Sequence, residues 1–405
     1  MNDDARQVAE RVARYSYGKL LSILAARSRD ITVAEDALAD AFVSALRVWP
    51  DQGVPTNPAA WLLTSARNAL LNTHKHSTIQ KTAAIEIERQ YHARASENPS
   101  YPDERLKLLF VCAHPSIDVS VRTALMLQTV VGIDSATIAN AFLVSPAAMG
   151  RRLVRAKTKI RDAAISFEVP DFDRLQERLP DVLDAIYAAF GTGWDHIASE
   201  NSKLTGLTDE AIYLARLLVE QLPLQPEPKG LLALMLYCDS RTAARRNHKG
   251  QFVPLKEQDS KLWNRDMIIE AEQLLGEASL SQTFGRYQCE AAIQSVHVQT
   301  PITGRTNFEA LKTLYQMLAA YCPTIGVLVA RATVFLEHGY PVTALEDLDA
   351  ITISVKETYQ PYWVAQALGL SAIGATLEAK LAMARAIGLT EDPAIKNYLR
   401  SQRLE

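Results

Sequence analysis

The chain has 405 residues, of which 48% are hydrophobic and 22% are charged, and its formal net charge at pH 7 is −3. That length is too great for one ordinary hydrophobic core, so we expect two or three domains. The composition is typical of a globular protein and excludes a largely disordered one. No apolar run is long enough to span a bilayer, and the N-terminus lacks the apolar core of a signal peptide. We therefore expect a cytoplasmic protein with no membrane partner.

The cysteines predict neither a disulfide framework nor a metal site. All four lie far apart in the sequence (Cys112, Cys238, Cys289 and Cys322), which favours a reducing compartment. Cys112 and His114 are close, but no further ligands are near them, so we interpret Cys112 as structural. Glycine-rich phosphate loops and the common catalytic motifs are also absent from the sequence. We expect no metal, no cofactor and no enzymatic activity.

The first predicted domain, residues 1–76, consists of amphipathic helices. Apolar residues recur with the 3.6-residue helical period here and in nearly every later segment, so an all-α fold is predicted. In "DITVAEDALADAFVSALRVW" the helix is expected to begin with a capping box formed by Thr32 and Glu35. The prolines and glycine of "PDQGVPTNP" then predict a break. Asn57 and Pro58 are placed to cap and start the next helix.

Two kinds of side chain in this domain are candidates for binding. Glu35, Asp36 and Asp40 form an acidic helix face, which is either simply solvated or complementary to a basic partner surface. Trp61 either packs in the core or stacks on unpaired bases, whereas Trp49 is expected in the core. The sequence leaves both alternatives open for the acids and for Trp61.

Polar residues continue from the end of this domain into the next segment. Arg67 and Lys75 are candidates for phosphate contacts, and Asn68 is a candidate for hydrogen bonds to bases or to the nucleic-acid backbone. The alternative for each is a solvated side chain. Residues 77–102, which run into "SENPSYPD", predict a linker between two domains.

The second predicted domain, residues 103–168, ends in the most basic helix of the chain. Ser145 and Pro146 are a good N-cap and first helical residue for it. One side of this helix is an apolar stripe (Met149, Leu153, Ala156 and Ile160), and the other carries cations (Arg151, Arg152, Arg155 and Lys159), with Lys157 and Arg161 beside the stripe. The helix contains no acid up to Arg161, and a face of one sign is costly unless an external anion binds it.

A short helix precedes the basic helix, with Ile138 and Phe142 expected to face inward and a tight turn at "LVS". Two helices joined in this way are typical of a helix-turn-helix, whose second helix enters the major groove by its N-terminal residues. In that interpretation Ser145 and Ala148 face base edges, while cations such as Arg152 reach bases or phosphates. The alternative is a plain helical hairpin.

The third predicted domain, residues 171–405, is helical and contains an internal repeat. Gly339, Ala344 and Leu348 match Gly374, Ala379 and Met383 at a shift of 35 residues, close to the tetratricopeptide period of about 34. Such repeats bind peptides or partner helices on a concave surface, so we expect a regulatory element. The polar segment 256–267, with Trp263, either lines a pocket for a ligand or partner or begins a helix with a packed tryptophan.

The ordered motifs of these domains resemble one protein family. "VVGIDSATIANAFLVSPAAMGRRLVRAKTKI" resembles the promoter-reading helix-turn-helix of bacterial ECF-type (extracytoplasmic function) sigma factors. "DITVAEDALADAFVSALRVWPDQGVPTNPAAWLLTSARNALLN" is similar to their other conserved domain, with its AED-A helix, W-P break, N-P-x-x-W-L segment and A-R-N. The third domain resembles the large tetratricopeptide-like helical extension of one ECF subgroup.

Three departures from the family pattern affect predicted contacts. The family's Thr-Val-Lys-Ser-Arg-Leu run reads A-M-G-R-R-L here, with Gly150 in the place of the lysine. One phosphate contact is then expected to move to Arg151. The family's D-x-x-R-R after A-R-N reads "ALLNTHKH", which carries less fixed charge, and "CCHP" reads "CAHP".

The resemblance implies a transcription initiation subunit. The "AEDALADAF" helix would dock on the β′ clamp helices of core RNA polymerase, and the "PDQGVPTNPAAW" loop, with Asn57 and Trp61, would capture the melted −10 element of promoter DNA. The second domain would read the −35 element and contact the β flap, and the extension would bind a regulatory protein or ligand. The alternatives are a stand-alone helix-turn-helix regulator with a helical sensor domain and a tetratricopeptide adaptor that does not bind DNA.

Overall fold

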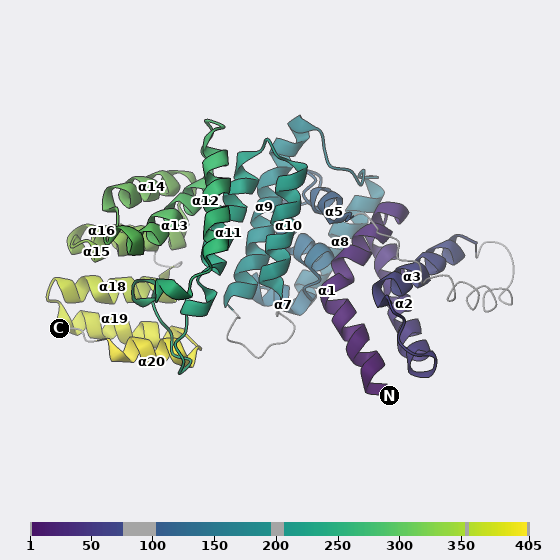
Figure 1. Ribbon diagram of the computed structural model, residues 1–405, viewed down its shortest axis with the longest axis horizontal. Coiled ribbons are helices and arrows are strands. Elements are labelled where there is room, and N and C mark those ends of the chain that lie inside the picture. The colour runs from purple at the N-terminus through teal and green to yellow at the C-terminus, as the bar shows by residue number, and fades with distance from the viewer. Residues whose placement is uncertain (1, 76–102, 196–205, 353–355, 403–405) are drawn as a thin grey trace. The chain divides into compact units, whose positions relative to one another are not determined.

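A computed structural model of the protein describes residues 2–75, 103–195, 206–352 and 356–402. Within these ranges the regular elements are helices and no strand forms, which confirms the predicted all-α fold. One isolated antiparallel bridge joins Arg246 and Phe252. The chain divides into two compact units, Met1–Leu217 and Leu218–Glu405 (Figure 1). The predicted linker, 77–102, lies outside the described residues.

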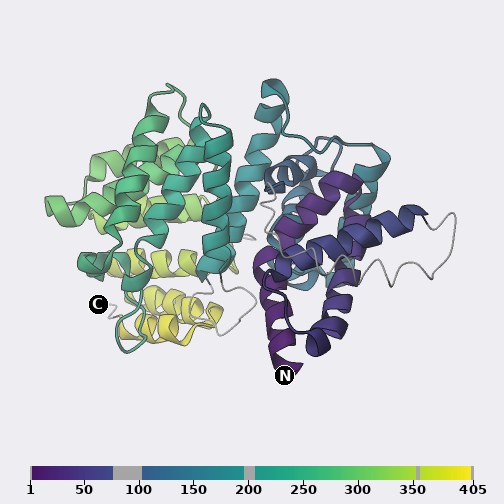
Figure 2. The same ribbon diagram turned by 45° about the vertical axis from the view of Figure 1, so that its right-hand side comes forward.

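The first unit begins with three helices that pack on one another: α1 (Asn2–Ser28), α2 (Ile31–Gln52) and α3 (Pro58–Lys75) (Figure 2). Asp30 is the N-cap of α2, and its Oδ1 accepts hydrogen bonds from the backbone N–H groups of Thr32 (2.8 Å) and Val33 (3.2 Å). A carboxylate at this position satisfies N–H groups that have no partner within the helix. The capping box predicted for Thr32 and Glu35 is therefore wrong, because Asp30 already fills that role.

The break between α2 and α3 begins later than predicted. α2 continues through Pro50 to Gln52, and Gly53 caps its C-terminus with a φ of 86°, which glycine adopts without strain. Asn57 then caps α3 as predicted, because its Oδ1 accepts a hydrogen bond from the backbone N–H of Ala60 at 3.0 Å. Pro58 is the first residue of α3, also as predicted. The loop at 54–57 is thus held between two helix ends.

Four helices follow residue 103: α5 (Arg105–Cys112), α6 (Val119–Met126) with the π-helical turn η1 (Leu127–Val131), α7 (Ser135–Ala141) and α8 (Pro146–Asp162). Their core includes Phe110 and Leu125, which are fully buried. Cys112 is buried too, and its Sγ lies 3.6 Å from Oγ1 of Thr129. This packing agrees with a structural role for Cys112.

Two further helices follow, α9 (Phe172–Asp195) and α10 (Leu207–Gln221), and the first unit ends within α10, at Leu217. α9 packs against α5, α6 and η1. Nη1 of Arg178 donates to the carbonyl oxygen of Phe110 at 3.3 Å, and Nη1 of Arg122 lies 2.7 Å from Oδ2 of Asp181. The first unit therefore includes helices that follow residue 171, where the third domain is predicted to begin. The domain boundary itself stays a prediction.

The second unit is a succession of helices: α11 (Pro226–Asp239), α12 (Arg265–Ser279), α13 (Arg286–Thr303), α14 (Phe308–Tyr321), α15 (Ile325–Glu337), α16 (Pro341–Asp349), α18 (Gln360–Ala372), α19 (Thr376–Leu389) and α20 (Pro393–Ser401). Short 3₁₀ turns lie between α11 and α12: η2 (Thr242–Ala244), η3 (Leu255–Glu257) and η4 (Ser260–Leu262). Helices that follow one another in the chain pack together, as α13 with α14 and α18 with α19 (Figure 1). The sequence left two roles open for Trp263, packing in the core and lining a pocket. Its side chain is 7% exposed and is therefore packed.

The internal repeat is visible in two helical pairs, α15–α16 and α18–α19. Gly339 and Gly374 occupy the turns of these pairs with φ of 84° and 81°. Ala344 and Ala379 are fully buried at the start of the second helix of each pair. Small residues at these positions let paired helices approach closely, as the sequence indicates. Membership of the tetratricopeptide class stays a prediction.

Candidate nucleic-acid interface

α8 separates a buried stripe from an exposed basic face. Oγ of Ser145 accepts a hydrogen bond from the backbone N–H of Ala148 at 3.3 Å, so the predicted N-cap is confirmed. The predicted stripe is buried (Met149, Leu153, Ala156 and Ile160), and the four predicted contact cations are exposed (Arg151, Arg152, Arg155 and Lys159). These cations form no ion pair with an acid in the described part of the chain. Their charge is therefore available to an external anion.

The connection between α7 and α8 is short and fixed by backbone hydrogen bonds. Asp134 caps α7 by accepting from the N–H groups of Ala136 and Thr137, both at 3.0 Å. After α7, the backbone N–H of Val144 donates to the carbonyl oxygen of Ala139 at 3.0 Å. Leu143, with φ of 52°, is 93% exposed in this turn. The N-terminal residues of α8 thus follow a rigid turn.

An open groove of about 540 Å³ runs along the basic face of α8. Arg152, Arg155 and Lys159 line it on one side, and Asp118 and Ser120 at the start of α6 line it on the other. Hydrogen bonds from Ser120, together with the charges of nearby arginines, hold the pKa of Asp118 below its usual value. A negative carboxylate there balances part of the positive charge that Arg152, Arg155 and Lys159 bring to the groove.

The acidic face of α2 is divided between exposed and paired side chains. Asp36 and Asp40 are exposed, whereas Glu35 is partly buried. Nζ of Lys157, on α8, lies 2.5 Å from Oε1 and 2.7 Å from Oε2 of Glu35. Of the three predicted polymerase contacts, one is therefore already bound to a cation of the same chain. The sequence placed Lys157 beside the apolar stripe but gave no sign of a partner 122 residues away.

The tryptophans of α2 and α3 lie in the core. Trp49 is 2% exposed and Trp61 is 5% exposed, with their rings in edge-to-face contact at a centroid distance of 5.5 Å. Core packing was one of the two roles left open for Trp61, and base stacking would require its ring to leave this position. Arg67 and Asn68 are partly buried on α3. Lys75 ends α3, and its side chain lies outside the described residues.

α1 and η1 approach each other more closely than side chains normally allow. A Cβ atom at Gly18 would lie 1.7 Å from the carbonyl oxygen of Val130, far inside van der Waals contact. Only glycine can occupy this position while the two backbones touch. We refer to this meeting of Gly18 and Val130 as the α1–η1 contact. Together with the Glu35–Lys157 pair it joins the first three helices to the helices that follow residue 103.

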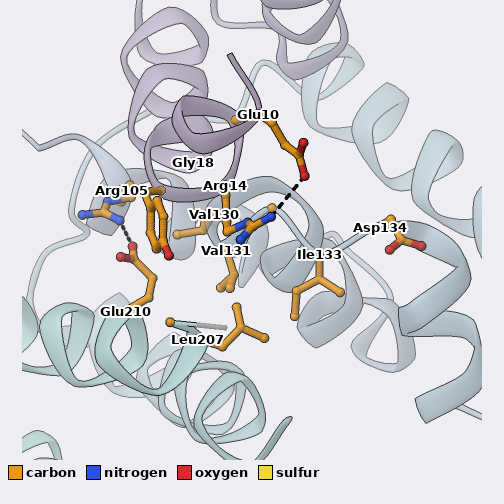
Figure 3. Close-up of a pocket in the computed structure, with 14 residues that line it drawn as sticks. Glu10, Arg14, Gly18, Arg105, Val130, Val131, Ile133, Asp134, Leu207 and Glu210 are labelled. Atoms are coloured by element: carbon orange, nitrogen blue, oxygen red, sulfur yellow. Dashed lines mark hydrogen bonds and ion pairs between the residues drawn. The ribbon is translucent and has the colours of Figure 1, made fainter. Parts of the chain in front are cut away.

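A pocket of about 280 Å³ lies beside this contact, between α1, η1 and the start of α10 (Figure 3). Four of its charged side chains form ion pairs, and the fifth, Asp134, caps α7. Nη2 of Arg14 lies 3.1 Å from Oε1 of Glu10, and Arg105 bonds to Glu210. Each of these four charges therefore already has a partner of opposite sign.

Arg105 is the centre of a buried polar cluster that sequence reasoning did not identify. Its side chain is 6% exposed and binds Asp103 twice, from Nε at 2.9 Å and from Nη2 at 2.6 Å. Its Nη1 binds Glu210 on α10, and its guanidinium lies 5.0 Å from the ring centroid of Tyr213. Burial raises the pKa of Asp103, but the hydrogen bonds and charge of Arg105 outweigh it and hold that pKa below its usual value. The cluster ties α10 to the start of α5.

Two parts of the chain match known families. Residues 12–78 match sigma-70 region 2, and residues 178–279 match a family of unknown function (DUF6596). An uncharacterized protein of Rhizobium meliloti (strain 1021) is 35% identical over 381 residues, which cover 92% of this chain and 90% of that protein. No solved structure matches the chain significantly.

The region 2 match covers most of α1 together with α2 and α3, where the acidic face and the predicted melting loop lie. It indicates a sigma-factor-like role in transcription initiation, which is not enzymatic, and implies binding to core RNA polymerase and promoter DNA. None of the described helices combines the length and apolar character needed to cross a bilayer. The same residues hold no group of three or more His, Cys, Asp or Glu side chains arranged to bind a metal ion.

Proposed function

Because the chain belongs to the same family as the Rhizobium meliloti protein and carries a sigma-70 region 2, we propose that it is an ECF-type sigma factor whose C-terminal helices control it. The exposed cations of α8 are the observation that supports this proposal most strongly. A sigma-70 region 2 alone accounts for polymerase binding and the −10 element, whereas a second DNA contact needs a second basic surface. The helix α8 supplies this second basic surface, and it follows a short turn fixed by backbone hydrogen bonds.

The first domain binds polymerase and melts DNA in this proposal. Asp36 and Asp40 offer exposed carboxylates to a basic surface, here the β′ clamp helices. The loop between α2 and α3 ends at Asn57, and Arg67 and Asn68 lie further along α3, so this edge of the domain faces the melted −10 strand. Lys75 would add a phosphate contact.

The second domain reads the −35 element through α8 and contacts the β flap. Its N-terminal residues, Ser145 and Ala148, are small enough for the helix end to approach base edges. Arg152 and Arg155 reach bases or phosphates, while Arg151 and Lys159 neutralise phosphates along the groove. The charge of these side chains is why the complex should weaken steeply with added salt.

The C-terminal helices control the two DNA-binding domains and bind a regulatory protein or ligand. The packing of α9 on α5, α6 and η1 supports this control, because any shift of α9 moves the helices around the −35 reader. A chain shortened after Gln221 keeps the described helices of the first unit, α1–α3 and α5–α10. Once its helical content and melting have been checked, its transcription and response to regulation should differ from those of the full chain. Unchanged activity and control would remove this part of the proposal.

The whole proposal is tested by transcription in vitro with bacterial core polymerase on a library of upstream regions. The full chain should bind core polymerase and select start sites that share −10 and −35 elements. Failure to bind core polymerase and to select start sites would contradict it. Sequence-specific DNA binding without polymerase would instead support the stand-alone regulator.

Arg152→Ala tests the role of α8 within that assay. If Arg152 reads a guanine, the variant loses about 1–3 kcal/mol of binding and accepts other bases at one position. Arg161→Ala is the matched control, because Arg161 lies on the same helix and already pairs with Asp162. Equal weakening by Arg152→Ala on specific and scrambled −35 sequences would show that Arg152 contacts only phosphate.

A further inference from the structure

We propose that the second unit binds a small carboxylate ligand between Arg241, which follows α11, and Trp263, which precedes α12. This inference deepens the ligand control in the proposed function, and it rests on that function only for its effect on transcription. Two groups form the site: a buried guanidinium that lacks a counter-ion among the described residues, and an indole N–H that lacks an acceptor there. Both lie far along the chain from the DNA-binding surfaces of the first unit.

Arg241 is a buried cation whose hydrogen bonds lead to neutral groups. Its side chain is 7% exposed. Nη2 donates to Oε1 of Gln294 at 2.7 Å and lies 3.8 Å from Sγ of Cys238. Nη1 is buried and has no hydrogen-bond partner in the described part of the chain. Burial of a charge is costly unless an opposite charge pairs with it, so this guanidinium is available to an anionic ligand.

Carboxylates in the same region are bound to other cations. Glu290, whose charge acts on the neighbouring Cys238, accepts a hydrogen bond from Nε of Arg286 at 2.8 Å. Glu337 lies 3.1 Å from Nζ of Lys256. The chain therefore neutralises these two acids without using Arg241.

The charge around Arg241 indicates the class of ligand. Burial, followed by the charges of Arg241, Lys256 and His338, lowers the pKa of His297 to about 4, so this imidazole is neutral at pH 7. His297 lies on α13, three residues after the Gln294 that binds Arg241. Because Lys256 is already paired, one positive charge is left to compensate at this place. A carboxylate brings one negative charge, whereas a phosphate dianion would bring a second that has no cation to meet it.

The segment 240–264 brings Trp263 to the same place. The backbone N–H of Asn264 donates to the carbonyl oxygen of Ser240 at 2.8 Å, so Trp263 and Arg241 are each next to a residue of this hydrogen bond. The ring of Trp263 is packed, but its Nε1 is buried and has no acceptor among the described residues. A buried donor of this kind needs a partner that the chain does not supply. The oxygens of one carboxylate can accept from both Nη1 of Arg241 and Nε1 of Trp263.

The segment 240–264 can move without loss of an α-helix. All its residues are described, and their regular structure consists of the 3₁₀ turns η2, η3 and η4 and the bridge between Arg246 and Phe252. Oε1 of Gln258, in the same segment, is a further buried atom that lacks a donor among the described residues. A ligand can therefore reach the buried groups by local rearrangement while the helices of the unit remain folded.

Calorimetric titration of the free full chain with acetate, propionate and lactate measures binding in the absence of polymerase, with ionic strength held constant by chloride. Saturable binding is expected in the roughly millimolar range, because ligands of so few atoms make few contacts. Arg241→Met should weaken binding at least about tenfold, since a charge-assisted hydrogen bond is lost. The variant should fold, because it replaces an unpaired buried charge by an apolar side chain. Arg305→Met, at an exposed cation of the same unit, should bind as the wild type does.

Indole N–H signals in nuclear magnetic resonance locate the ligand. The chain has five tryptophans, so labelling with nitrogen-15 gives one indole signal for each. Propionate should shift the signal of Trp263. It should leave the signal of Trp363 in place, because Nε1 of Trp363 already donates to the carbonyl oxygen of Lys356 at 3.1 Å. Trp263→Phe identifies the signal, keeps an aromatic ring in the core, and should weaken binding about threefold to tenfold, since one neutral hydrogen bond is lost.

Four results would overturn the proposal: no saturable binding of any of the three carboxylates, binding that Arg241→Met leaves unchanged, a Trp263 signal that does not move at saturation, or binding of inorganic phosphate in place of the carboxylates. All of them are measured without polymerase, so each leaves the sigma-factor function intact. A wild type that binds a carboxylate at Arg241 but does not bind core polymerase would instead contradict the proposed function and leave this site in place.

Discussion

The two compact units differ in what joins their helices. In the first unit, side chains far apart in the sequence meet as buried or partly buried ion pairs: Glu35 with Lys157, Arg105 with Glu210, and Arg122 with Asp181. In the second unit, neighbouring helices meet through apolar residues, as Ala332, Ala344 and Leu348 do between α15 and α16.

Polar contacts in the second unit join neighbouring helices and also segments far apart in the sequence. Arg331 on α15 binds Asp347 on α16 with two hydrogen bonds of 2.8 Å. Glu227 accepts hydrogen bonds from the backbone N–H groups of Tyr287 (2.9 Å) and Gln288 (3.1 Å), and so caps α13. The more distant pair Arg246–Asp392 is about one-third exposed on both sides.

This difference determines how each unit can change. Buried ion pairs contribute little net stability, because the cost of removing two charges from water offsets their attraction, but they define one arrangement and can be exchanged for another partner. Apolar contacts between stacked helices contain no charged group that could bind another partner instead. The first unit is therefore suited to opening and the second to remaining folded as a platform.

The largest expected effect tests the ion pairs that join helices of the first unit. Arg105→Met leaves Asp103 and Glu210 without their cation, and should lower the free energy of unfolding by about 4 kcal/mol, since one partner of a buried pair is lost. Hydrogen exchange should report the loss first in α5 and α10. Lys107→Met is the matched control two residues away, because the Lys107–Glu104 pair is partly exposed and should cost less than about 1 kcal/mol.

If Arg105→Met and Lys107→Met lowered the free energy of unfolding equally, the buried pairs of Arg105 would not be what stabilises the first unit. A loss from Arg105→Met that appears first in the second unit would lead to the same conclusion.

The next effect tests the close packing of the second unit. A Cβ atom at Gly230 on α11 would lie 2.6 Å from the backbone nitrogen of Gln288 on α13, where no side chain can move aside. Gly230→Ala should therefore destabilise this unit by about 3 kcal/mol, measured by chemical denaturation. In contrast, a Cβ atom at Gly276 on α12 would meet no atom within 4 Å. Gly276→Ala should be neutral or stabilise by up to about 1 kcal/mol; a comparable loss there would refute the explanation.

A smaller effect tests the second unit through pH. Burial, followed by the nearby cations Arg241 and Lys256, lowers the pKa of His297 to about 4 from 6.5. Between these values the unfolded chain takes up a proton that the folded chain does not, so stability is present above pH 6.5 and is lost as pH falls towards 4. His297 is only partly buried, so we expect a loss of about 2 kcal/mol. Calorimetry of His297→Gln at several pH values should show that this part of the pH dependence of stability is lost. If the pH dependence is unchanged, His297 is not its source.

The smallest effect separates the two sides of α8. A Cβ atom at Gly150 would meet nothing within 4 Å, so the position tolerates larger residues. Gly150→Lys should stabilise the helix by less than about 1 kcal/mol and make the salt dependence of promoter binding steeper by about one released counterion. Gly150→Ala should stabilise the helix equally without changing the salt dependence. If both variants have the same salt dependence, this side of α8 does not face phosphate.

The sequence was sufficient wherever structure depends on neighbours along the chain. The buried stripe of α8, its cap at Ser145 and the cap at Asn57 follow from helical periodicity and local hydrogen bonding. The start of α2 was misassigned because Thr32 and Asp30 are both good caps, and only the backbone geometry decides between them.

Contacts between distant residues could not be predicted in the same way. The ion pair of Lys157 could not be predicted, because nothing in the local sequence distinguishes Lys157 from Arg161, the other cation beside the apolar stripe. Gly18 lies within a helix, where glycine is normally unfavourable, and this was the one available signal of a close approach. Likewise, the pairing of Arg105 with Glu210 on α10 could be identified only from the three-dimensional structure.

The matching turns at Gly339 and Gly374 bear on how this kind of chain can vary in length. Each glycine follows one helix and precedes a buried alanine at the same spacing, so the 35 residues from one turn to the next form one repeat unit, here called a module. Gain or loss of a whole module leaves both flanking turns intact, whereas a shorter insertion would place a side chain where the glycine or alanine is required. Differences in length between relatives should therefore fall in this region in steps of one module.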